Sequence, residues 1–110
     1  MHKKNEVFHG SNNVFADLGL PDAEEMLVKS ELARQILSII KGRRLTQAGA
    51  AEILGIDQPK VSALTRGKLG GFSLERLIHF LNALGRDVQI IVKPKSRTRQ
   101  AGGLKVVTSR

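Results

Sequence analysis

Apolar residues recur every three or four positions over much of the chain between residues 22 and 84, which is the period of amphipathic helices. The first such segment opens at Pro21 and Asp22 and should run to about Lys41. The last opens after Ser73, a residue type that caps helices, and should end at Gly85. Each segment has one apolar stripe, which predicts that both helices share a core: Leu32, Ala33, Ile36, Ile39 and Ile40 in the first, and Leu74, Leu77, Ile78, Leu81 and Leu84 in the last.

Two shorter helices are predicted between these segments. Thr46 caps the first, whose body is residues 47–54. Asp57 caps the second, which covers residues 58–66 and has Pro59 in its first turn. Proline is tolerated there because its missing N–H group would have no partner within the helix. The chain is therefore predicted to be all-α up to the end of its last helix.

After the last helix the apolar period changes from 3.6 to 2, and Pro94 ends the alternation. This pattern predicts one C-terminal β-strand over residues 87–93. A lone strand is not stable in water, and residues 104–108 are only a weak candidate partner. We therefore expect the strand to pair with the same strand of a second subunit, and the alternative is a strand that lies on the helical core. The expected dimer contacts are the residues Val88, Ile90 and Val92.

Composition narrows the class of protein. A chain of 110 residues is the size of one ordinary domain, and its apolar residues include four Phe and no Trp or Tyr, which suits a small helical core. The absence of cysteine excludes disulfides and every zinc finger that needs thiolates. No run of about 20 apolar residues and no signal peptide can be recognised, so we expect a cytoplasmic protein that has no contact with a membrane.

The net charge of +8 is distributed unevenly. Residues 1–31 carry three basic and six acidic side chains, whereas residues 41–68 carry six basic and two acidic ones. Residues 93–110 carry six basic side chains and no acidic one. Basic segments attract nucleic acid because contacts with phosphates release condensed counterions. The two basic segments are therefore candidate contacts with a polyanion.

Residues 47–66, QAGAAEILGIDQPKVSALTR, have the spacing of a helix-turn-helix. Ala51 is small where the two helices should cross, and Gly55 stands four residues later at the turn between them. Val61 and Leu64 lie three residues apart, as they must to hold the second helix against the core. This combination predicts a second helix that can enter the DNA major groove.

If those two residues point inward, helix geometry places Pro59, Ser62, Ala63 and Arg66 on the outer face. Gln58 stands in the first turn, where its amide could pair with adenine, and Arg66 could bind guanine or a phosphate. Ser62 could bind a phosphate or a base, and Ala63 could touch a thymine methyl group. Gln47 and Lys60 should bind the DNA backbone, and the flanking basic residues should add nonspecific attraction. The predicted DNA-binding residues are Arg43, Arg44, Thr46, Gln47, Gln58, Pro59, Lys60, Ser62, Ala63, Arg66 and Lys68.

At the positions Gln47, Ala51, Gly55, Gln58, Val61, Ser62, Leu64 and Gly67 the sequence resembles the phage Cro and repressor type of helix-turn-helix protein, the XRE family. Over residues 13–95 it is similar to the HigA-like antitoxins of type II toxin–antitoxin systems. The resemblance implies a lambda-repressor-like bundle of four to five helices that binds a palindromic operator as a homodimer and represses its own operon. It also implies neutralisation of a HigB or RelE-type toxin that cleaves mRNA.

The chain is thus divided into an N-terminal arm (1–21), a helix-turn-helix DNA-binding domain (22–86), a dimerisation strand (87–94) and a basic disordered tail (95–110). Alternatives remain open: a solitary XRE-type regulator, a protein-interaction module that covers a basic partner, or an RNA-binding protein led by the tail. His2, His9 and His79 have no metal-site spacing, and no nucleophile or phosphate-loop motif is present. We therefore expect no enzyme activity, no metal and no cofactor.

Overall fold

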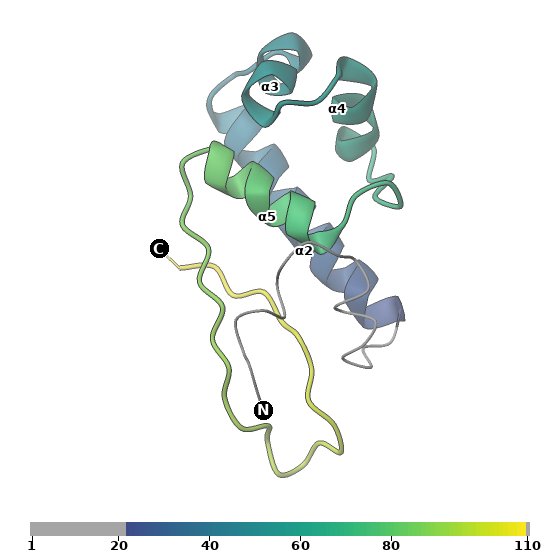
Figure 1. Ribbon diagram of the computed structural model, residues 1–110, viewed down its shortest axis with the longest axis vertical. Helices are drawn as coiled ribbons and strands as arrows, with labels where there is room; N and C mark the ends of the chain where they lie inside the picture. Colours follow the sequence, from purple (N-terminus) through teal and green to yellow (C-terminus); the bar gives the residue numbers. More distant parts are fainter. Residues whose placement is uncertain (1–21, 110) are drawn as a thin grey trace.

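The computed structural model describes residues 22–109, and the predicted N-terminal arm lies outside this range. Four helices follow one another in the described part of the chain (Figure 1). Each begins and ends within two residues of its predicted limits, so the helix predictions are confirmed. The helices are α2 (Asp22–Gly42), α3 (Gln47–Leu54), α4 (Gln58–Thr65) and α5 (Leu74–Ala83).

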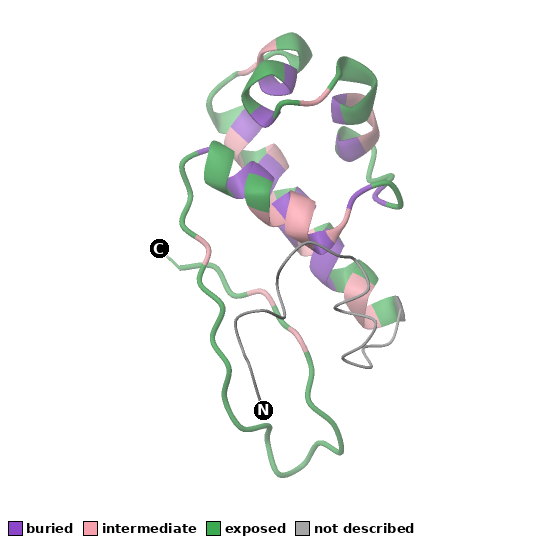
Figure 2. Ribbon diagram, in the orientation of Figure 1, coloured by how far each residue is buried: buried purple, intermediate pink, exposed green. Residues whose placement is uncertain are grey.

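The long helix α2 and the helix α5 pack against each other, and α3 and α4 form a second pair at one end of them (Figure 1). The inward faces of all four helices are buried together (Figure 2). Ile36 of α2 and Leu77 of α5 are both fully buried, as the apolar stripes predicted. Ile39 and Ile78, predicted to belong to the same stripes, are only half-buried at the edge of this core.

Three side chains fix where the shorter helices begin. Thr46 accepts a hydrogen bond of 3.0 Å from the Gly49 N–H at the start of α3. Asp57 accepts one of 3.0 Å from the Lys60 N–H in α4, and Ser73 accepts one of 3.0 Å from the backbone of α5. Each cap satisfies an N–H group that has no partner within its own helix. The three predicted caps are therefore present.

The loop between α4 and α5 contributes to the core. Leu69 and Phe72 are both buried, although only the glycines of this loop stood out in the sequence. The Phe72 ring meets the Phe80 ring edge to face, with centroids 5.8 Å apart. The guanidinium of Arg76 lies 5.6 Å from one ring centroid and 5.5 Å from the other, within the range of cation–π attraction. The loop is thereby held against α5.

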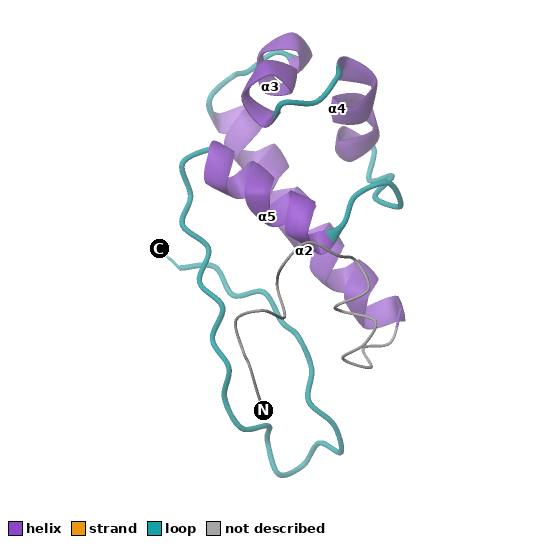
Figure 3. Cartoon of the chain, in the orientation of Figure 1, coloured by secondary structure: helices purple, strands orange, loops and turns teal. Residues whose placement is uncertain are grey.

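The predicted C-terminal β-strand is not formed. Among residues 22–109 no strand is present, and the chain after α5 is drawn as loop (Figure 3). A strand requires a hydrogen-bonded ladder, and no backbone hydrogen bond joins residues 87–95 to any other described segment. Val88 is half-buried against the core, whereas Ile90 is 47% exposed and Val92 86% exposed. The segment thus extends away from the core without a partner strand.

Residues 104–108 return to the helical core. Leu104 and Val106 are half-buried against it, and the Leu104 N–H donates a hydrogen bond of 2.9 Å to the Glu24 carboxylate. The Gln35 amide donates a hydrogen bond to the Thr108 hydroxyl. Apolar residues at alternate positions give this short segment one face that can pack on α2.

No helix in the described part of the chain is long and apolar enough to cross a membrane.

Candidate nucleic-acid interface

The turn between α3 and α4 depends on one glycine. Gly55 has a φ of 72°, in the left-handed region that other residues rarely adopt. Its N–H donates a hydrogen bond of 2.8 Å to the Ala51 carbonyl, and the Ile56 N–H donates one of 3.1 Å to the same oxygen. Ala51 is itself buried, at 8% exposure. The predicted turn and the small residue near the crossing are therefore both present.

The helix α4 is held by two residues and leaves its other face open. Val61 is 1% exposed and Leu64 is fully buried, so both point into the core as predicted. The helix contacts both α3 and α2. In Figure 1 it lies at an outer edge of the molecule, and no other described helix covers it. It is a helix that can approach DNA from outside.

The residues predicted for the outer face differ in how far they project. Gln58, Pro59 and Lys60 are exposed in the first turn of α4, and Arg66 is exposed at its end. Ser62 and Ala63, which were predicted to face outward with them, are half-buried. The strongest base-reading candidates therefore lie at the two ends of α4, and the middle of the helix offers only small side chains.

Gln58 has the chemistry and the position to read a base. Its amide carries a donor and an acceptor, which match adenine N7 and N6 in the major groove. Arg66 follows the last turn of the helix, and its Nε donates a hydrogen bond of 3.3 Å to the Ser62 carbonyl. This bond turns the Arg66 side chain along the helix and leaves its terminal N–H groups available for guanine or phosphate.

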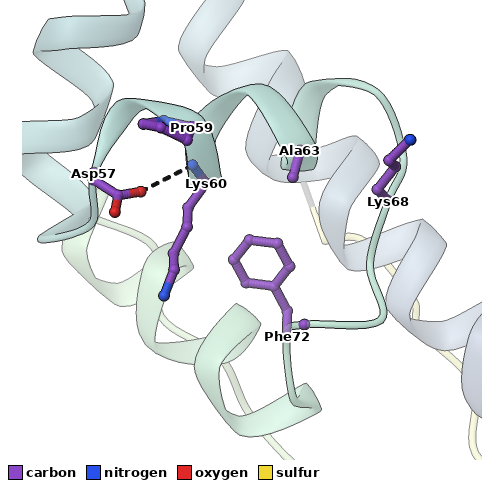
Figure 4. Close-up of a pocket in the computed structure, with 7 residues that line it drawn as sticks. Asp57, Pro59, Lys60, Ala63, Lys68 and Phe72 are labelled. Carbon is purple, nitrogen blue, oxygen red and sulfur yellow. Dashed lines mark hydrogen bonds between the residues drawn. The ribbon is translucent and has the colours of Figure 1, made fainter.

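A shallow hollow of about 260 Å³ lies beside α4. Phe72 lies between the side chains of Lys60 and Lys68 in this hollow (Figure 4). Among the described residues, none of the ion pairs involves either lysine. Phe72 is buried beneath this hollow, and Pro59 and Ala63 provide more accessible carbon in its lining. Such a lining suits the sugar-phosphate backbone, since the lysines can bind phosphates while the sugars contact carbon. The hollow is lined by Asp57, Pro59, Lys60, Ala63, Lys68, Gly71 and Phe72.

The start of α3 supplies a second candidate for backbone contacts. Gln47 is the first residue of α3, and both it and the capping Thr46 are exposed. The Thr46 hydroxyl accepts from the Gly49 N–H and keeps its own O–H as a donor, so both side chains can donate to a phosphate. The positive end of the helix dipole favours an anion at the same place.

The two arginines before α3 have different roles in the structure. The guanidinium of Arg43 donates a hydrogen bond to the Leu84 carbonyl, and so joins the end of α2 to the end of α5. Arg44 is exposed and has a φ of 54°, which is uncommon for a residue other than glycine. Of the pair, Arg44 is therefore the better placed to add charge for DNA, and Arg43 has a structural contact of its own.

Phe72 and Gly71 were not among the predicted site residues, although both line the hollow. A signal for Phe72 was present in the sequence, because an apolar residue directly before a capping serine commonly packs against the helix that follows. His79 is exposed on α5, and its Nε2 lies 3.9 Å from the Glu75 carboxylate. No group of three potential metal-binding side chains is present among residues 22–109.

Comparison of the sequence and the structure with known proteins identifies the family. Residues 14–93 match the family described as a helix-turn-helix domain. A solved structure named "Putative XRE Family Transcriptional Regulator" is 52% identical in sequence and superposes with a TM-score of 0.77. The match covers 81% of this chain and 100% of that one, whereas no curated protein is similar enough to count as a match. The chain therefore belongs to the helix-turn-helix proteins and, within them, to the XRE family of DNA-binding transcriptional regulators.

Proposed function

We propose that this regulator is a sequence-specific repressor that binds a palindromic operator as a homodimer. The observation that carries the proposal is the orientation of α4: Val61 and Leu64 are buried while Gln58 and Arg66 are exposed at the helix ends. A helix held in this way can lie along base edges in the major groove. Two-fold symmetry of the protein would match a palindrome whose half-sites are about 34 Å apart.

Selection from a random duplex library with the purified protein would test this function. We expect enrichment of an inverted repeat whose half-site centres are about 10 base pairs, or one helical turn, apart. The selected duplex should bind about 10³-fold or more tightly than random duplex at the same salt concentration. Recovery of no sequence, or equal affinity for random DNA, would contradict sequence-specific binding.

Single substitutions separate base reading from general attraction. Gln58→Ala and Arg66→Ala should each weaken binding to the selected duplex by about 1–3 kcal/mol, which is the contribution of one base contact. Affinity for random duplex should change much less with Gln58→Ala, because that residue carries no charge. Ser38→Ala on α2 is a matched control, since Ser38 is exposed, carries no charge and lies outside the predicted contact set. A Gln58→Ala variant that keeps full specificity would exclude α4 as the reading helix.

We further propose that the protein is an antitoxin that represses its own operon and neutralises a HigB or RelE-type toxin. The support is the sequence resemblance over residues 13–95 and the excess of acidic side chains in residues 1–31, which suits a basic partner. Co-expression with the neighbouring gene tests this role. The full chain should co-purify with that gene product and relieve its growth inhibition. A neighbouring gene product that neither binds this protein nor inhibits growth would contradict the antitoxin role and favour a solitary regulator.

A further inference from the structure

The segment from Asp87 to Lys93 combines unpaired backbone groups with exposed apolar side chains, and its first two residues share a hollow with residues 106–109. Its N–H and C=O groups make no backbone hydrogen bond to any other described residue. Ile91 is 77% exposed and Val92 86% exposed, in a segment with the alternating pattern of a strand. Such an edge tends to pair with another chain. A second copy of the same chain can be that partner, and the sequence of the segment decides whether the pairing is self-complementary.

We propose that two copies of this segment pair antiparallel about a two-fold axis at Ile90, with Asp87 of each copy opposite Lys93 of the other. This inference rests on the proposed homodimer and defines its register. Pairing about residue 90 sets each residue opposite the one that is equally far on the other side of 90. Val88 then meets the partner's Val92, and Ile90 meets its own copy. Gln89 meets the partner's Ile91 on the opposite face of the pair.

Within residues 87–93, opposite charges stand across from each other in this register and in none of the neighbouring ones. Asp87 and Lys93 are the only charged residues between residues 87 and 93, and they stand at equal distances from Ile90. Both are exposed, and no ion pair within the described chain involves either of them. In the dimer they form two cross-strand pairs of opposite charge, one at each end of the apolar segment. Opposite charges directly across a strand pair are favourable and like charges are unfavourable.

Neighbouring registers fit less well. Pairing about residue 89 sets Asp87 opposite the partner's Ile91, and it sets Val92 opposite an arginine at position 86. Pairing about residue 91 sets Val88 opposite Pro94, which cannot donate to the ladder. If the two-fold axis lay midway between residues 90 and 91, apolar residues would stand opposite polar ones on both faces. Val88 would then stand opposite Lys93 of the other copy. Among these registers, only the one at residue 90 sets each of Val88, Ile90 and Val92 opposite one of the same three residues in the other copy.

The position of the segment leaves the DNA-binding helix free. In Figure 1 it leaves the end of α5 and runs along the side of the molecule away from α4. Val88, on the even-numbered face, is half-buried against the core of its own chain. The paired segments would therefore pack their continuous apolar face toward the two helical bodies and leave both α4 helices open to DNA.

Cysteine cross-linking of the full chain tests the register, because the natural sequence has no cysteine. Residues directly opposite in an antiparallel pair have Cβ atoms about 4.5–5.5 Å apart, and diagonal neighbours are farther apart. Under mild oxidation Ile90→Cys should give a covalent dimer. Gln89→Cys and Ile91→Cys should each give little alone but form a dimer when the two variants are mixed. A covalent dimer from Ile91→Cys alone that exceeds the one from Ile90→Cys would overturn the proposed register.

Charge exchange provides a second test that does not depend on cross-linking. Asp87→Lys and Lys93→Asp should each weaken dimerisation about tenfold, since each variant creates two like-charge pairs. The double variant restores opposite charges in the exchanged order and should return the dimer dissociation constant to within about threefold of the natural value. Sedimentation equilibrium measures these constants. If the two single effects add in the double variant, the Asp87–Lys93 pairing is excluded.

These results are distinguishable from failure of the proposed function. One outcome is a protein that dimerises and binds a palindrome but shows neither charge rescue nor an Ile90→Cys cross-link. Such a protein dimerises through another surface, so the inference is overturned while the function stands. A protein that forms the predicted cross-links but binds no specific DNA sequence supports the register and contradicts the repressor. Circular dichroism melting of each variant shows that its helices are intact, so weaker dimerisation cannot be attributed to unfolding.

Discussion

Replacing Gly55 with alanine should destabilise the protein by about 1 kcal/mol. The residue has a φ of 72°, and a Cβ atom there would meet nothing within 4 Å. The cost therefore comes from the backbone alone, because the left-handed conformation costs other residues about 1–2 kcal/mol. Alanine also restricts the unfolded chain by about 0.4–1 kcal/mol, which offsets part of this cost. The remaining destabilisation should lower the melting temperature by about 4–8 °C.

Gly42 provides the matched control. It is the last residue of α2, its φ is not positive, and a Cβ atom there would also meet nothing within 4 Å. Gly42→Ala should therefore stabilise the protein by about 0.5–1 kcal/mol, with the opposite sign to Gly55→Ala. Urea unfolding followed by circular dichroism measures both free energies. Equal effects of the two substitutions would refute the argument that the turn between α3 and α4 requires a left-handed residue.

Three further predictions concern the core, a helix cap and the DNA backbone. Leu64→Ala should lower the free energy of unfolding by about 2–5 kcal/mol because the side chain is fully buried, whereas the exposed Thr65 should tolerate alanine with a decrease below about 1 kcal/mol in the same urea titration. Thr46→Ala should lower the free energy of unfolding by about 0.5–2 kcal/mol because it removes the cap on α3, whereas Thr46→Asp should keep most of that stability. Equal free energies of unfolding for the two variants would contradict capping. Lys68→Ala should weaken binding to all duplexes alike and reduce the slope of log affinity against log salt by about one, and an unchanged slope in fluorescence anisotropy titrations would exclude a phosphate contact.

The helices could be predicted from the sequence because several local signals agreed. Thr46, Asp57 and Ser73 have the side chains that cap helices, and each is followed by an apolar stripe of helical period. The face of α4 that packs against the core followed from spacing alone, since residues three apart, such as Val61 and Leu64, lie on the same face of a helix. These features depend on residues close together in the chain, which is why one sequence was enough to place them.

Features that depend on distant residues could not be predicted in the same way. Phe72 lies in a glycine-rich loop, and its burial follows from the Phe80 ring and the Arg76 guanidinium of the next helix. The contact of Arg43 with the Leu84 carbonyl joins two helix ends that lie 41 residues apart. Alternation over residues 87–93 predicted a strand, but alternation describes side chains and supplies no partner for the backbone. In the single chain the segment therefore stays unpaired.

Contact between DNA and the open face of α4 can be measured by the protection of single thiols from alkylation. Ser62→Cys introduces a thiol in the middle of α4 with little change of size, and Asn82→Cys introduces one at an exposed position of α5. With a selected duplex bound, we expect that alkylation at position 62 slows at least about tenfold, a change of about 1.4 kcal/mol, while that at position 82 keeps its rate. Unchanged alkylation at position 62 in a saturated complex would show that DNA binds elsewhere on the protein.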